Sequence, residues 1–157
     1  MNASVTGEVF RRLSRRYVRV SLVYLVLGLL SGEGMMYFGN DNIQFLHSHM
    51  LLVGTGLFAA YGAGFRWIGS KADEGPLPGV SAAAANVQFW IANAGLPGML
   101  LGSVLPVGLG LDRIGILFGF MEAAAGAHFA LLLNRAFKAR SRAEQGPQNR
   151  TAKQGRS

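Results

Sequence analysis

Four long apolar stretches constrain this chain more than any other feature of its sequence. They cover about residues 20–38, 43–65, 86–105 and 114–133. Each is close to the length of about 20 residues that a helix needs to cross the hydrocarbon core of a bilayer. Hydrophobic residues make up 50% of the 157-residue chain, which is high for a soluble domain. The sequence therefore predicts an all-α integral membrane protein, a four-helix bundle that occupies residues 20–134.

Basic segments flank this predicted bundle at both ends. Residues 1–19 contain five arginines and predict either a disordered leader or a short amphipathic helix at the lipid headgroups. In the second case Val9, Phe10 and Leu13 form its apolar side. Residues 135–157 are rich in Arg, Gln and Gly, a composition that predicts a disordered tail.

The distribution of positive charge predicts the orientation of the chain. With four spans, 14 of the 15 Lys and Arg residues fall on one side, and only Arg113 falls on the other. The positive-inside rule then places both termini in the cytoplasm, and we expect the inner (cytoplasmic) membrane of a bacterial cell. Because the basic residues cluster at the ends of the spans, we interpret the net charge of +7 as membrane topology and expect no nucleic-acid partner.

Small residues recur at four-residue spacing inside the predicted spans. The pairs are Gly28 with Gly32, Ala60 with Gly64, Gly98 with Gly102, and Gly115 with Gly119. Helices in lipid associate through close backbone approach, which such spacings allow. They predict a tight bundle and favour a homo-oligomer.

Two histidines open the second apolar stretch, at His47 and His49. Ionisable side chains within a span are costly, so they are functional candidates. The chain has no cysteine, which limits metal ligands to His, Met, carboxylate and backbone groups. Successive helix residues point about 100° apart, so the two imidazoles point to nearly opposite sides of their helix and do not chelate one ion together.

Counting along each predicted helix places several polar and sulfur-containing residues at one depth. With about 1.5 Å per residue from the outer face, residues from all four helices fall within roughly one helical turn. His128 lies about 12 to 15 Å deeper, and we expect a structural role for it. The residues that share the outer layer are Glu33, His47, His49, Met50, Met99 and Glu122.

This outer layer predicts a metal or haem site. Imidazole ligates haem iron and copper, thioethers suit copper(I) and cytochrome haem, and carboxylates suit harder ions. Arg113 lies just above the layer and pairs either with a haem propionate or with Asp112 or lipid headgroups. The alternatives are structural: histidines as interhelical hydrogen-bond donors, methionines as packing, and glutamates as a proton relay or as hydrogen-bonded pairs.

The segment from His47 to Gly62, HSHMLLVGTGLFAAYG, resembles the second-helix histidine segment of the haem–copper oxidase superfamily, especially nitric oxide reductase large subunits. The chain from about residue 17 to residue 137 is similar to small four-helix membrane proteins related to cytochrome c oxidase subunit I. The resemblance implies that His47 matches a haem b ligand and that His49 belongs to the motif of the small group. Two departures are Leu51 and Thr55, which stand where a polar residue and a tryptophan are expected. The sequence also has no counterpart of the multi-histidine copper site.

From these features we expect a haem b protein that transfers electrons or binds a diatomic gas such as oxygen or nitric oxide. Any catalysis would be oxidoreduction, with an electron-donor protein or a quinol as partner. One alternative is a membrane protein that binds copper or another metal ion. The other is a structural or accessory subunit with no cofactor.

Overall fold

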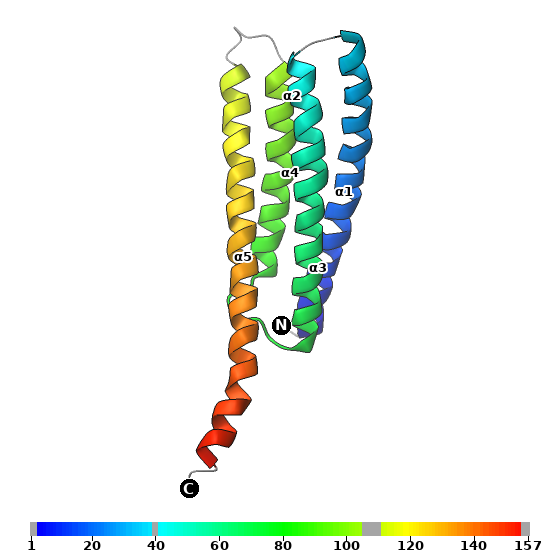
Figure 1. Ribbon diagram of the computed structural model, residues 1–157. Coiled ribbons are helices and arrows are strands. Elements are labelled where there is room, and N and C mark those ends of the chain that lie inside the picture. The colour runs from blue at the N-terminus through cyan, green and yellow to red at the C-terminus, as the bar shows by residue number, and fades with distance from the viewer. Residues whose placement is uncertain (1–2, 39–40, 105–110, 155–157) are drawn as a thin grey trace.

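The computed structural model describes residues 3–38, 41–104 and 111–154, and within these ranges the chain is helical apart from the loop 75–81, with no strand (Figure 1). Helix α1 spans Ala3–Phe38. The second rod runs without a break through α2 (Asp41–His49), the π-helix η1 (Met50–Leu57) and α3 (Phe58–Glu74). Helices α4 (Ala82–Val104) and α5 (Leu111–Gln154) complete the fold. The described residues of all four apolar stretches are therefore helical, as predicted.

Three of the helical rods are long and apolar enough to cross a membrane. These are Gly7–Tyr37, Asn42–Glu74 and Arg113–Gln145, with lengths of 31, 33 and 33 residues. The finding fits a multi-pass membrane protein, since about 20 apolar residues suffice to span a bilayer. Helix α4 is the shortest of the rods, with 23 residues, and continues through Pro97.

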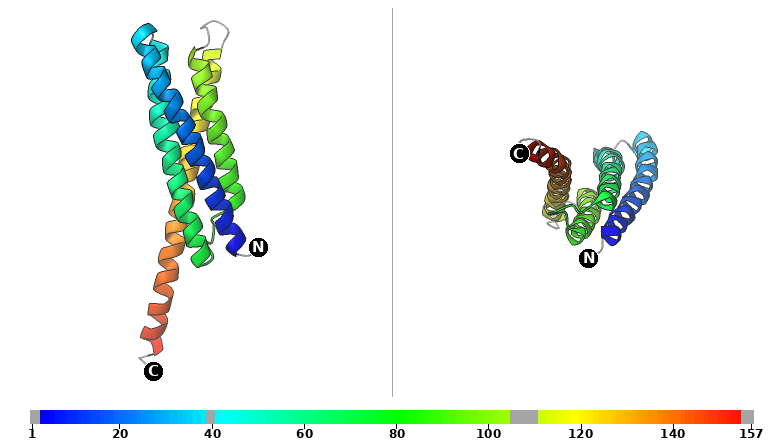
Figure 2. Two further views of the ribbon diagram at one scale, coloured as in Figure 1. Left: turned by 90° about the vertical axis from the view of Figure 1, so that its right-hand side faces the viewer. Right: turned by 90° about the horizontal axis from the view of Figure 1, so that it is seen from below.

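The rods pack as two antiparallel pairs (Figure 2). Helix α1 lies along the α2–η1–α3 rod, and α4 lies along α5. A short loop joins α3 to α4, and within it Gly79 adopts a left-handed backbone conformation with φ of 78°. The hydroxyl of Ser81 then accepts a hydrogen bond from the Ala84 N–H, a typical cap at the start of a helix.

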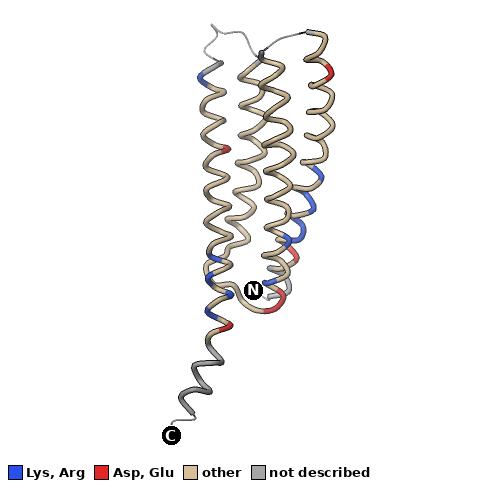
Figure 3. The backbone as a smooth tube through the Cα atoms, in the orientation of Figure 1, with Lys and Arg blue, Asp and Glu red and all other residues tan. Residues whose placement is uncertain are grey.

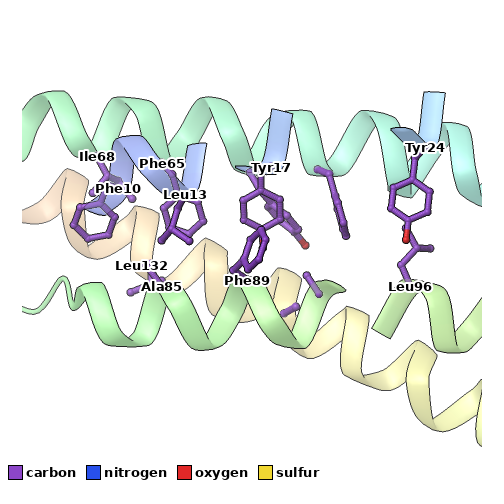
Figure 4. Close-up of a cluster of buried hydrophobic side chains, with 14 of the residues drawn as sticks. Phe10, Leu13, Tyr17, Tyr24, Phe65, Ile68, Ala85, Phe89, Leu96 and Leu132 are labelled. Atoms are coloured by element: carbon purple, nitrogen blue, oxygen red, sulfur yellow. The ribbon is translucent and has the colours of Figure 1, made fainter. Parts of the chain in front are cut away.

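An aromatic core joins the two pairs (Figure 4). The Tyr17 ring of α1 lies 5.2 Å from that of Tyr61 and 5.0 Å from that of Phe89, measured between centroids. On α3 and α5, the Phe65 and Phe129 rings are 5.3 Å apart. Rings at these separations contribute beyond the area they bury. The core therefore connects α1 to α4 and α3 to α5.

The N-terminal segment differs from both predictions made for residues 1–19. It is neither a disordered leader nor a separate surface helix, because α1 begins at Ala3 and runs unbroken into the first apolar stretch. Phe10, Leu13 and Tyr17 recur every three to four residues and share one face, which is buried. The exposed arginines lie between these positions, so one helix carries both the basic residues and part of the core.

The C-terminal tail also differs from the prediction of disorder. Helix α5 continues through Gln154 instead of ending near residue 133. Ala136 is fully buried, and Arg140 pairs with Glu74 of α3 and with Glu144 one turn along α5. These contacts, together with the good helix propensity of Ala, Arg and Lys, explain the longer helix.

The small-residue spacings do bring helices close together, as predicted. The Gly115 side of α5 meets the Gly102 backbone of α4, since a Cβ built on Gly115 lies 3.2 Å from Gly102 Cα. Similarly, a Cβ on Gly28 of α1 lies 2.6 Å from the Leu51 side chain. A side chain at Gly115 would press on the α4 backbone, and one at Gly28 would require the Leu51 side chain to move.

Candidate functional site

His47 lies in α2 with its imidazole against α1. Its Nδ1 atom donates a hydrogen bond of 2.8 Å to the backbone carbonyl of Gly28. A carbonyl only accepts, so the Nδ1 atom carries the proton and the Nε2 atom presents a lone pair. Metal-ligating histidines typically show this arrangement, in which the distal nitrogen is anchored to a backbone carbonyl or carboxylate.

The glycines of α1 make room for this ring. A Cβ built on Gly32 would lie 2.8 Å from His47 Cε1, so only glycine leaves space for the imidazole at this height. The Gly28 carbonyl also accepts a hydrogen bond from the Ser31 hydroxyl, at 2.7 Å. The Gly28–Gly32 spacing thus both brings α1 close to α2 and orients His47.

His49 is anchored within its own helix. Its Nδ1 atom donates to the Phe45 carbonyl one turn earlier, at 3.0 Å, and its ring lies on the Phe45 ring with centroids 3.9 Å apart. As for His47, the Nε2 atom is left as the acceptor. Both histidines are half-buried, and each presents one free imidazole nitrogen.

A π-helix begins immediately after the histidine pair, a feature that the sequence interpretation missed. Within η1 the Thr55 hydroxyl donates to the Met50 carbonyl five residues earlier, at 3.1 Å. Gly54 is buried against the ring of Tyr24 of α1. Single-turn π-bulges are frequent at functional sites, and this stretch is longer than one turn. The only sequence signal for it is the pair of glycines flanking Thr55.

The side chains around the histidines are only partly covered. From Asn42 to Val53 every described residue is half-buried or exposed, whereas α3 contains seven buried residues. Met50, one helical turn after His47, packs beside Gly28. The histidine end of this rod therefore remains accessible, while its other end forms the core.

Met99 and Glu122 lie in the other helical pair. Met99 of α4 packs its sulfur over Gly119 of α5. Glu122 of α5 lies against Gly95 of α4 and is 6% exposed. Neither carboxylate oxygen of Glu122 has a hydrogen-bond partner among the described residues.

The Tyr61 hydroxyl of α3 lies next to Gly126 of α5, one helical turn after Glu122, and is buried without a hydrogen-bond partner among the described residues. A buried carboxyl inside an apolar bundle can exchange a proton or accept a hydrogen bond from a polar ligand.

Gln88 of α4 is the polar residue that the sequence interpretation missed. It is fully buried, accepts a 2.6 Å hydrogen bond from the Tyr17 hydroxyl, and donates to the Ala125 carbonyl at 3.3 Å. It therefore links α1, α4 and α5. An amide in an otherwise apolar stretch was the available signal, but its partners lie 71 and 37 residues away.

The remaining predicted site residues are not gathered around the histidines. Glu33 of α1 and Arg113 of α5 are both exposed. Across the part of the chain that the structure describes, no three His, Asp or Glu side chains form a group that could hold a metal ion. The geometry therefore offers His47 and His49 as single imidazole ligands, each apart from Glu122.

Comparisons of this chain with protein-family models, with curated proteins and with solved structures gave no match.

Proposed function

We propose that the chain is an integral membrane protein in which α4 forms a fourth span beside the three apolar rods. The polar side chains of α4 lower its hydropathy, but they bond within the bundle. Asn86 donates to the Ala82 carbonyl, Asn93 to the Phe89 carbonyl, and Gln88 to α5. Satisfied polar groups are compatible with a lipid environment. Val87, Trp90 and Leu101 are exposed on the same helix, as expected of a lipid-facing surface.

The same proposal places both termini in the cytoplasm of a bacterial cell. Lys and Arg gather at the end of the molecule that holds the N-terminus, the α3–α4 loop and the end of the α5 span (Figure 3). Positive residues are enriched on the cytoplasmic side of membrane proteins. The histidine segment, at the opposite end, then lies near the outer surface.

The function that the site supports best is haem b binding through the Nε2 atom of His47, in electron transfer or in binding a diatomic gas. The observation that carries this proposal is the hydrogen bond from His47 Nδ1 to the Gly28 carbonyl, which fixes the tautomer and orientation of the ring. A single imidazole suffices as the axial ligand of a b-type haem, so the residues present fit the group. His49, with the same tautomer on another side of α2, is available as a second ligand.

The protein contributes position and environment to such a site. A bound haem would supply reversible iron redox chemistry or a coordination position for a gas. The Gly28 carbonyl holds the His47 ring in place by accepting the hydrogen bond from its Nδ1–H. The half-buried segment from Asn42 to Val53 leaves the imidazoles accessible from outside the core. A homo-oligomer, and an electron-donor protein or quinol as partner, belong to the same proposal.

Absorbance spectra of the detergent-purified protein, oxidised and reduced, test haem binding. We expect a Soret band and reduced b-type bands that His47→Ala abolishes. His128→Ala is the matched control, because it removes a half-buried histidine from α5 and leaves the α2 pair intact. A protein with no Soret band after expression with sufficient haem would contradict the proposal and favour an accessory subunit without a cofactor.

One contact favours copper as a second candidate. Met50 follows His47 by one helical turn, and the two pack against Gly28 and Gly32 of α1. An imidazole and a thioether together suit copper(I). Elemental analysis that finds copper and no haem, with copper lost in both His47→Ala and Met50→Leu, would select this function.

A further inference from the structure

A cavity of about 420 Å³ lies at the predicted cytoplasmic end, between the α3–α4 loop and α5. This volume is within the range of roughly 300–1,000 Å³ typical of small-molecule sites. Pro76 and Pro78 form its loop side, and Arg135, Lys138 and Arg142 form its helix side. Every charged side chain that the structure describes along its wall is basic. The cavity is therefore chemically suited to an anion.

The three cations share one face of α5. Residues at spacings of three and four lie on the same side of a helix, so their side chains point to a common region. None of the three forms an ion pair with a described residue. Their neighbour Arg140, by contrast, pairs with Glu74 and Glu144. Glu74 and Glu144 thus pair with Arg140, and no described acidic side chain pairs with the three cavity cations.

The positive-inside rule alone does not account for this arrangement. That rule requires basic residues near the end of a span but not on one face or along a cavity. Arg12 and Arg19 of α1 meet the rule equally well, being exposed in the basic part of their helix without lining this cavity. The cavity therefore needs a further explanation.

Leu131 forms an apolar surface beside the cavity. It precedes Arg135 by one helical turn, lies on the same face of α5 and is 54% exposed. Phe137 lies on another face of α5, where it packs on Trp67 of α3 with ring centroids 4.3 Å apart, and tryptophan is enriched at the level of the lipid headgroups. A ligand that combines an anionic head with an apolar tail would contact the cavity and Leu131 at once.

We propose that this cavity binds the phosphate group of an anionic ligand through Arg135, Lys138 and Arg142. The adjoining apolar surface favours the phosphodiester of an anionic membrane lipid as the source of that phosphate. Basic pockets at the cytoplasmic ends of transmembrane helices recognise such headgroups. Guanidinium groups suit the task because they bind phosphate oxygens in a bidentate manner. This site is independent of the histidines and of any cofactor.

Native mass spectrometry of the full-length protein, with phosphatidylglycerol or phosphatidylcholine added, tests the proposal. We expect wild-type protein to retain phosphatidylglycerol in preference to phosphatidylcholine. The double variant Arg135→Gln with Arg142→Gln should lower the affinity for phosphatidylglycerol by roughly tenfold or more. The matched control, Arg12→Gln with Arg19→Gln, removes the same charge elsewhere and should leave the affinity unchanged.

The remaining outcomes are equally decisive. Equal loss of affinity in both double variants would overturn the proposal, because binding would then depend on diffuse surface charge. Inorganic phosphate that binds wild type in detergent and displaces the lipid would keep the phosphate site but identify a free phosphate as its ligand. If the glutamine variants fail to fold, the variant Arg135→Lys with Arg142→Lys, which keeps both charges, is compared with wild type instead. The proposal would also be overturned if both proteins bound phosphatidylglycerol equally well and without preference over phosphatidylcholine.

Discussion

At the scale of single residues, the buried polar side chains of Gln88 and Glu122 differ in their hydrogen bonding. Gln88 is fully buried and bonds to both the Tyr17 hydroxyl and the Ala125 carbonyl. Glu122 is 6% exposed, yet neither carboxylate oxygen has a hydrogen-bond partner in the part of the chain that the structure describes. A buried polar group without a partner costs stability, whereas a bonded one does not. We therefore assign Gln88 to structure and regard Glu122 as retained for a reason other than stability.

Substitutions at these two positions should have opposite consequences. Gln88→Leu leaves the buried Tyr17 hydroxyl without its acceptor and should lower the free energy of unfolding by about 1–3 kcal/mol. Glu122→Gln keeps the shape of the side chain and removes no hydrogen bond, so stability should stay the same or rise. Thermal unfolding of the detergent-solubilised protein measures both. Equal losses in the two variants would show that Glu122 is as important for folding as Gln88.

At the scale of elements, the π-helix η1 is the least expected feature. It lies between the histidine pair and the aromatic core, and the flanking residues keep ordinary helical dihedrals, −74° and −35° at His49 and −67° and −35° at Phe58. The rod therefore passes through the wider segment without a break. Because a π-helix alters the angular spacing of residues, it changes the register of His47 and His49 relative to α3.

The contact of Gly54 with Tyr24 holds η1 against α1, and a matched pair of alanine substitutions tests it. A Cβ on Gly54 would lie 2.4 Å from Tyr24 Cγ, whereas a Cβ on Gly56 meets nothing nearer than the Leu51 carbonyl oxygen at 3.7 Å. Gly54→Ala should cost about 1–3 kcal/mol through overpacking. Gly56→Ala should be neutral or stabilising, since alanine favours helix. Thermal unfolding of the two variants that gave the reverse order would contradict the packing of η1 on α1.

At the scale of the whole molecule, ion pairs at the basic end act both within one helical pair and between the two pairs. Arg11 of α1 pairs with Asp73 of α3, and Glu74 of α3 pairs with Arg140 of α5. These pairs are partly exposed, so each adds little stability, but together they connect three helices at one level. In the proposed four-span topology this level lies on the cytoplasmic side, so the end of α3 and the part of α5 around Arg140 both face the cytoplasm.

Cysteine labelling tests this topology directly, because the chain has no cysteine of its own. Single substitutions Asn42→Cys, Ser70→Cys and Ser141→Cys are probed with a membrane-impermeant maleimide in intact and lysed cells. We expect Asn42→Cys to be labelled in intact cells whose outer membrane surface the reagent can reach. The other two positions should be labelled only after lysis. Ser70→Cys and Ser141→Cys on opposite sides would show that α4 does not cross the membrane.

Much of the fold could be predicted from the sequence, because hydropathy and helix spacing are local properties. The four apolar stretches are helical, and the Gly28–Gly32 and Gly115–Gly119 spacings bring helices close together. The predicted ends of α1 and α5 were wrong, since arginine-rich segments were treated as separate from the helices that they extend. Residues such as Phe10 and Ala136 are buried only because α3 and α4 lie beside them.

The sequence by itself determined that this chain forms long apolar helices with its positive charge at one end, because each residue carries its own hydropathy and charge. Only the tertiary structure decided which polar side chains have partners. Gln88 bonds across three helices, Glu122 has no hydrogen-bond partner among the residues of the described ranges, and His47 is oriented by a carbonyl 19 residues earlier. These differences arise from contacts between distant residues, which no local pattern in the sequence records.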